Sequence, residues 1–330
     1  MRFRRRIPVT IIGGFLGSGK TTLVNYLIQY GGKRFGVVVN EFGDLGVDGA
    51  LIQRLEGDGS GEIMELAGGC LCCVGREDLV QALVLLARAP NPPEYVLIEL
   101  SGLADPVPVL QTLLDPEVRA VFETDGLITV VDARNFFATL EQNSETALQL
   151  AYCNTVVLNK ADLADTELLE DVENAVQQLS PLAQVVVTTR SSAPLEKLLN
   201  LRAFDPEFED KTRAHEHAHT QGVSSFSLHA NAPLDLVAWQ WFLQDLILSK
   251  PAEVLRVKGW LSLEGIPEKV LFQAVRDIFT AEATTQKSDG RSSIVVIGRN
   301  LDEGEYRSRF ADAVKKVVPV LTRHSVLPNS

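Results

Sequence analysis

The feature that most constrains this 330-residue chain is a glycine-rich stretch, GGFLGSGKTT, at residues 13–22. A short apolar, strand-like run precedes it, and a helical pattern over residues 21–29 follows it. A phosphate-binding loop joins a strand to a helix in this order, so that backbone N–H groups and the positive end of the helix surround a phosphate. The fixed positions of that loop pattern are occupied by Gly14, Gly19, Lys20 and Thr21.

Each polar residue of such a loop has an expected role. Lys20 would neutralise the β- and γ-phosphate oxygens, and the Thr21 hydroxyl would bind Mg²⁺. The buried-strand pattern at residues 95–99 ends on Glu99, where a phosphate-loop enzyme places its second Mg²⁺ residue. Gly102 follows and would let the backbone approach the γ-phosphate, because it has no side chain.

A loop of alternating glycines and carboxylates follows the next strand-like run, at residues 35–39. Phosphate-loop enzymes place a switch loop here, which offers carboxylates to Mg²⁺ or to the attacking water. Glu41 and Asp44 are therefore candidate catalytic residues. An acidic surface loop without such a role is the alternative.

A second nucleotide signature, Asn159-Lys160-Ala161-Asp162, ends a further strand-like run at residues 154–158. A carboxylate at Asp162 accepts hydrogen bonds from N1–H and the exocyclic amine of guanine. Adenine offers no such pair and would leave the carboxylate unsatisfied. The motif therefore predicts that the nucleotide is GTP.

Three thiols crowd into one short segment, at Cys70, Cys72 and Cys73. Thiolates at this spacing suit Zn²⁺, Co²⁺ or Cu⁺, provided that a kink at the flanking glycines brings all three onto one ion. A redox-sensing cluster is the alternative. Cys153 stands apart from these three and is expected in the core.

Composition limits the class of protein and its partners. The net charge of −12 argues against a nucleic-acid partner, which would require a basic face. No run of about 18 apolar residues is present, so no membrane span is expected. Clustered rather than dispersed cysteines suggest the reducing cytoplasm.

The order of patterns predicts two domains. Strands alternate with helices over residues 1–203, which indicates a doubly wound, mainly parallel α/β sheet with its ligand at the carboxyl edge. Residues 204–222 are polar and predict a linker; its alternate histidines would bind metal or lie in solvent, and they are His215, His217 and His219. Residues 223–330 predict a smaller α+β domain, with strands at 224–228, 254–263, 270–279 and 294–297 and helices at 234–248 and 303–317.

Taken together, these motifs resemble those of the CobW family of metal-handling GTPases. The resemblance covers nearly the whole chain and is carried by the segments Gly14–Thr22, Asn40–Asp44, Gly69–Cys73, Glu99–Pro106, Asn159–Asp162, Arg256–Gly259 and Val296–Arg299. It implies a GTP-hydrolysing metallochaperone that passes zinc from the three cysteines to a client metalloprotein or chelatase. It also implies nucleotide contacts at Gly17, Ser18 and Thr22, and a nucleotide-dependent homodimer.

Two positions depart from the family pattern. Many members have Glu where this chain has Asp44, and Thr, Ser or Cys where it has Leu100. Some relatives are associated with cobalt for cobalamin synthesis, so a cobalt-handling GTPase is one alternative. A redox-responsive regulatory GTPase is another, whereas a small-molecule phosphotransferase would need neither the guanine signature nor clustered thiols.

Overall fold

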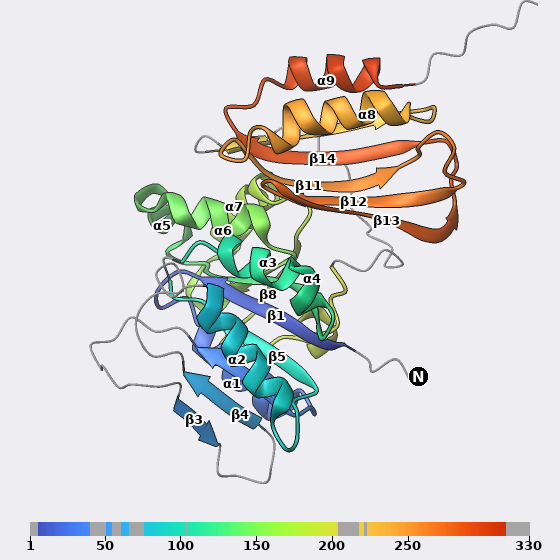
Figure 1. Ribbon diagram of the computed structural model, residues 1–330. Helices are drawn as coiled ribbons and strands as arrows, with labels where there is room; N and C mark the ends of the chain where they lie inside the picture. The colour runs from blue at the N-terminus through green and yellow to red at the C-terminus, as the bar shows by residue number, and fades with distance from the viewer. Residues whose placement is uncertain are drawn as a thin grey trace, which may run out of the picture.

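The computed structural model describes residues 6–39, 51–54, 61–65, 76–102, 104–203, 218–220 and 223–314 (Figure 1). For the strands at 51–54, 61–65 and 218–220 it describes only the backbone. The described chain forms an α/β unit followed by a second, antiparallel sheet with two helices on its outer face.

The first unit is built on a sheet in the order β3-β4-β2-β5-β1-β6-β7-β8. β3 pairs antiparallel to β4, and the other neighbouring pairs are parallel. This confirms the predicted doubly wound, mainly parallel sheet. The strands are β1 (Ile7–Gly14), β2 (Phe35–Val39), β3 (Leu51–Arg54), β4 (Gly61–Glu65), β5 (Tyr95–Glu99), β6 (Phe122–Asp132), β7 (Thr155–Asn159) and β8 (Gln184–Val187).

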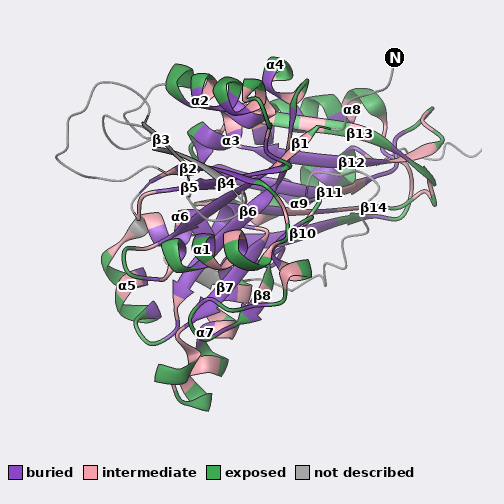
Figure 2. Cartoon of the chain, turned by 90° about the horizontal axis from the view of Figure 1, so that it is seen from below, coloured by how far each residue is buried: buried purple, intermediate pink, exposed green. Residues whose placement is uncertain are grey.

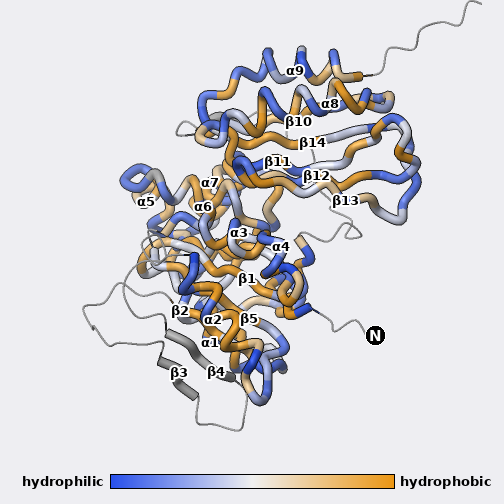
Figure 3. The backbone as a smooth tube through the Cα atoms, viewed as in Figure 1, coloured by the Kyte–Doolittle hydropathy of each residue, from blue (hydrophilic) through white to orange (hydrophobic). Residues whose placement is uncertain are grey.

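Helices cover both faces of this sheet because its central strands are apolar on both sides (Figure 3). In β5, Val96 and Ile98 face one core, and Tyr95 and Leu97 face the other. The second of these cores is closed by α1 (Lys20–Tyr30) and a 3₁₀ turn at Leu195–Lys197. The remaining helices pack on the first core and are α2 (Arg76–Arg88), α3 (Val107–Leu114), α4 (Pro116–Arg119), α5 (Phe136–Gln142), α6 (Ser144–Tyr152) and α7 (Thr166–Leu179).

The second unit is an antiparallel sheet in the order β13-β12-β11-β14-β10-β9. α8 continues into a π-helix at Leu243–Leu248, and both pack with α9 on the sheet through buried aromatic side chains. This confirms the predicted α+β architecture. The elements are β9 (Ala218–Thr220), β10 (Val223–Ala230), α8 (Leu236–Phe242), β11 (Val254–Leu261), β12 (Glu268–Val275), β13 (Ile278–Lys287), β14 (Ser292–Arg299) and α9 (Glu303–Asp312).

Three predicted boundaries in this half were wrong. The run 270–279 is two strands, because the chain turns at Arg276, whose φ is 54°. The predicted linker contributes an edge strand, β9, whose backbone pairs with β10. The final helix ends at Asp312, short of its predicted end.

The two units pack together, because buried residues of the second sheet belong to the first core. Buried residues fill most of the central strands of both sheets (Figure 2). Arg256 is 3% exposed, and its guanidinium donates to the carbonyl oxygens of Tyr152 and Cys153 at the end of α6. Arg276 donates to Asp105 Oδ2 at 3.0 Å and to the Tyr152 hydroxyl at 3.1 Å. The second sheet is therefore joined to the segment that follows β5.

In the described part of the chain, no helix has the length and apolarity that crossing a membrane requires.

Candidate nucleotide-binding site

The glycine-rich loop joins β1 to α1, as its sequence predicts. Gly14 has a φ of 134°, and a Cβ there would lie 2.3 Å from the Val130 carbonyl oxygen. Gly19 has a φ of 112°, and its Cβ would lie 2.4 Å from Asn159 Nδ2. Only glycine fits these two positions, because both the backbone conformation and the space exclude a side chain. The loop also includes Gly17, in the same left-handed region with a φ of 75°.

Two buried polar side chains lie in the loop. Lys20 is 7% exposed, and its Nζ donates to the Phe15 carbonyl oxygen at 3.2 Å, across the loop. Burial lowers the pKa of Lys20, and the charge of Glu99 partly opposes that shift. The Ser18 hydroxyl is 1% exposed and has no hydrogen-bond partner in the described structure. An unpartnered buried hydroxyl and a buried cation together fit an anion such as a phosphate.

The two predicted magnesium residues lie together. Thr21 Oγ1 donates to Glu99 Oε1 at 2.7 Å, and Glu99 is 6% exposed at the end of β5. A hydroxyl and a carboxylate oxygen are ligands that Mg²⁺ uses beside nucleotide phosphates. Gly102 lies against the glycine-rich loop, because a Cβ there would be 2.6 Å from the Leu16 nitrogen. Thr22 is exposed on the first turn of α1.

Asn159 connects three segments of the site. It is 3% exposed; its amide nitrogen donates to the Ser18 carbonyl oxygen at 2.9 Å, and its amide oxygen accepts from Ser191 N–H at 2.7 Å. The Thr188 hydroxyl also donates to that oxygen, at 3.2 Å. Asn159 therefore fixes the segment after β7 and the segment after β8 to the glycine-rich loop. Both polar atoms of the Asn159 side-chain amide therefore have hydrogen-bond partners within the protein.

The other two residues of the guanine signature face outward. Lys160 lies in the left-handed region, with a φ of 59°, and its Nζ is 2.7 Å from Asp132 Oδ2 at the end of β6. Burial opposes ionisation of Asp132, but hydrogen bonds from Lys160 and Asn135 outweigh it and lower the pKa of Asp132. Asp162 is exposed, which leaves its carboxylate accessible to a base.

Three residues of the site were not predicted from the sequence. Thr188 and Ser191 follow β8 and complete the Asn159 contacts, and the Ser191 hydroxyl also donates to the Gly19 carbonyl oxygen at 3.1 Å. The polar residues that follow β8 could have indicated this part of the site from the sequence, because ligands bind at the carboxyl ends of parallel strands. Gln149, on α6, contacts Gly14 and has no local motif that could have identified it.

Several predicted residues lie outside the described part of the chain. These are the switch candidates Glu41 and Asp44, the thiols Cys70, Cys72 and Cys73, and His215 and His217. His219 lies in β9, of which only the backbone is described. Within the described ranges, no group of three His, Cys, Asp or Glu side chains could hold a metal ion.

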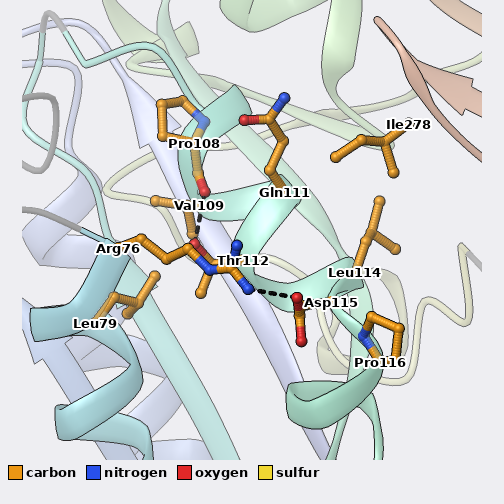
Figure 4. A pocket seen from close by; sticks show the side chains of 10 residues that line it. All are labelled: Arg76, Leu79, Pro108, Val109, Gln111, Thr112, Leu114, Asp115, Pro116 and Ile278. Carbon is orange, nitrogen blue, oxygen red and sulfur yellow. Dashed lines mark hydrogen bonds and ion pairs between the residues drawn. The ribbon is translucent and has the colours of Figure 1, made fainter.

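Two cavities lie near these elements. The first, of about 400 Å³, opens between α2, α3, α4 and β13 and contains none of the predicted site residues (Figure 4). Three of its polar side chains have local partners: Arg76 pairs with Asp115, and the Thr112 hydroxyl donates to the Pro108 carbonyl oxygen. The second, of about 240 Å³, adjoins the glycine-rich loop and is lined by Ser18 and Gln149 among others.

The fold and this site together define a phosphate-loop nucleotide-binding protein. Residues 8–187 match the family described as CobW/HypB/UreG, nucleotide-binding domain, and residues 223–314 match the cobalamin synthesis protein CobW C-terminal domain. The chain belongs to this CobW family, as its motifs predicted.

Individual relatives agree with this assignment over almost the full length. The zinc chaperone CobW of Pseudomonas aeruginosa is 33% identical, over 95% of this chain and 93% of that protein. The zinc-regulated GTPase metalloprotein activator 1 of Schizosaccharomyces pombe is 27% identical, over 89% and 83%. The crystal structure of zinc-bound YjiA GTPase from Escherichia coli superposes with a TM-score of 0.79 at 27% identity, covering 94% of this chain and 100% of that one. These matches confirm the predicted class, a GTPase.

Proposed function

We propose that this protein is a GTP-hydrolysing metallochaperone that holds zinc at Cys70, Cys72 and Cys73 and transfers it to client metalloproteins. The names of its relatives support zinc as the metal and a metalloprotein as the recipient. Within this proposal the nucleotide is GTP, selected by Asp162, and Mg²⁺ is held by Thr21 and Glu99. A cytoplasmic location and a nucleotide-dependent homodimer remain predictions.

The observation that carries this proposal is the register of the sheet at its carboxyl edge. Val39 of β2 pairs with Glu65 at the end of β4 on one side and with Glu99 at the end of β5 on the other. Neighbouring strands are about 4.8 Å apart, so the backbone at Glu65 lies roughly 10 Å from that at Glu99. The cysteine-bearing residues follow Glu65 and precede α2, which begins at Arg76. The strand that precedes them in the sequence therefore ends two strands away from the Mg²⁺ residue Glu99.

This placement supports coupling between nucleotide and metal. The switch candidates Glu41 and Asp44 follow Val39 in the sequence, and Val39 ends β2 between the two glutamate positions. Ordering of that segment around γ-phosphate and Mg²⁺ would move its neighbour. A chaperone must first hold its metal and then release it, and a change in affinity accomplishes this. Each tenfold change corresponds to about 1.4 kcal/mol of differential binding.

The test measures Zn²⁺ affinity by chelator competition, with GDP and with a non-hydrolysable GTP analogue. We expect the wild type to differ at least about tenfold between the two nucleotides. A triple Cys→Ser variant of the three clustered cysteines should lose tight binding in both states. Cys153→Ser is the matched control, because Cys153 is fully buried away from the sheet edge and should leave zinc affinity unchanged.

Two results would contradict the proposal. Equal zinc affinity in both nucleotide states would separate metal release from the nucleotide, and tight zinc binding by the triple variant would place the metal elsewhere. Thermodynamic linkage supplies an independent check, since bound zinc must change the affinity for GTP by the same factor. Repeating the titration with Co²⁺ distinguishes zinc handling from cobalt handling.

A further inference from the structure

Gln149 is a buried glutamine on α6 that connects two loops of the nucleotide site. It is 2% exposed, and its amide oxygen accepts from Gly14 N–H, in the glycine-rich loop, at 2.8 Å. Its amide nitrogen donates to the Ala104 carbonyl oxygen at 2.9 Å and to the Gly102 carbonyl oxygen at 3.4 Å. Three of the four hydrogen bonds that a glutamine amide can make therefore go to backbone atoms of these two loops.

The two loops that Gln149 joins are those expected on either side of the γ-phosphate. Gly14 begins the phosphate loop, and Gly102 follows the Mg²⁺ residue Glu99. They also touch directly, because a Cβ on Gly102 would lie 2.6 Å from the Leu16 nitrogen. Bonds of this kind are strong in a buried setting, where no water replaces a lost partner.

The backbone of α6, the helix that carries Gln149, is itself held in place. The Thr129 hydroxyl, on β6, donates to the Gln149 carbonyl oxygen at 3.2 Å. Three residues further along α6, Arg256 of the second sheet donates to the Tyr152 carbonyl oxygen at 2.8 Å. The backbone of α6 is thus supported by the central sheet and by the second unit. Support of this kind holds a functional group in one geometry.

We propose that Gln149 is a positioning residue for GTP hydrolysis, an inference that rests on the GTPase activity of this family. It sets the distance from the phosphate loop to Gly102 and Ala104, and so places Gly102 N–H where the γ-phosphate is transferred to water. Lys20 and the loop backbone still bind the β- and γ-phosphates without it. Loss of Gln149 should therefore reduce kcat more than it weakens nucleotide binding.

The main test compares Gln149→Met with Gln177→Met. Methionine keeps the length of glutamine and removes its hydrogen bonds. Gln177 is a matched control on α7, because its side chain donates to the nearby Ala183 carbonyl oxygen at 3.3 Å and lies outside the nucleotide site. We expect Q149M to lower kcat at least about tenfold, equivalent to about 1.4 kcal/mol in the barrier. KM for GTP and the affinity for a fluorescent GDP analogue should change less than about threefold, and Q177M should match the wild type in all three.

Gln149→Glu supplies a second test that does not depend on Q149M folding. A carboxylate still accepts from Gly14 N–H but cannot donate to Ala104, whereas a protonated carboxyl group can donate. The ratio of Q149E to wild-type kcat should therefore rise at least about fivefold between about pH 8 and pH 6, because burial raises a carboxyl pKa into that range.

The outcomes separate this inference from the proposed function. A wild type that does not hydrolyse GTP would overturn both. An active wild type would overturn the role of Gln149 alone if Q149M kept its kcat, or if kcat and GDP affinity fell by the same factor. A flat pH ratio for Q149E would also overturn it.

Discussion

Asn159 and Asp162 belong to one four-residue motif, yet the structure predicts opposite effects of replacing them. Asn159 is buried and uses its amide within the protein, whereas Asp162 is exposed. Asn159→Ala should weaken GTP and GDP binding together and retain the preference for guanine over adenine. Asp162→Ala should remove that preference and leave the loop contacts of Asn159 in place.

The size of each expected loss in nucleotide affinity follows from the hydrogen bonds that the substitution removes. Asn159→Ala leaves the Ser18 carbonyl oxygen and Ser191 N–H without these partners, at roughly 1–3 kcal/mol each. Both bonds join parts of the protein itself, so part of this loss falls on the stability of the fold. We expect the rest to weaken both guanine nucleotides about 10- to 100-fold. Asp162→Ala should reduce the ratio of GTP to ATP affinity by at least about 100-fold, because polar pairing to guanine discriminates by roughly 10⁴.

Competition binding with GTP, GDP and ATP measures both effects, and thermal unfolding reports the stability change. Asn231→Ala is a suitable control, because Asn231 is exposed in the second unit, and it should bind all three nucleotides as the wild type does. Binding of GTP by Asn159→Ala within about twofold of the wild type would contradict the structural role of Asn159. A strong preference for GTP in Asp162→Ala would contradict its role in guanine recognition.

Three further predictions concern the catalytic cation, the contact between the units and acid stability. Lys20→Ala should reduce steady-state phosphate release to background, because it removes the loop cation. Arg276→Met should lower the free energy of unfolding by about 1 kcal/mol in a urea titration, since its ion pair with Asp105 is partly exposed. The lowered pKa of Asp132 means that the stability from its bond to Lys160 is present at neutral pH and is lost as the pH falls through that pKa. Asp132→Asn should therefore flatten the acid side of a plot of melting temperature against pH.

The sequence predicted the parts of the site that have a local pattern. The strand 95–99 was placed at its observed ends, because a buried apolar run stops at a charged residue. The glycine-rich loop has a fixed spacing and was equally visible. Ser191 and Gln149 were not predicted, since each acts through a backbone atom more than a hundred residues away along the chain. Such contacts depend on the tertiary structure, and no spacing rule indicates them.

At Arg276, a strand boundary that the sequence did not show coincides with a contact between the two units. The apolar residues on both sides of Arg276 gave one continuous strand pattern, so periodicity alone did not show the break between β12 and β13. At this turn Arg276 adopts a left-handed backbone conformation, which is unfavourable by roughly 1–2 kcal/mol for a residue with a side chain. Its guanidinium there reaches Asp105, in the segment that follows Glu99, and the Tyr152 hydroxyl on α6. The hydrogen bonds offset the unfavourable backbone, so the conformation of this turn depends on the first unit. The segment that follows Glu99 is therefore held both by Gln149, at Ala104, and by the second sheet, at Asp105.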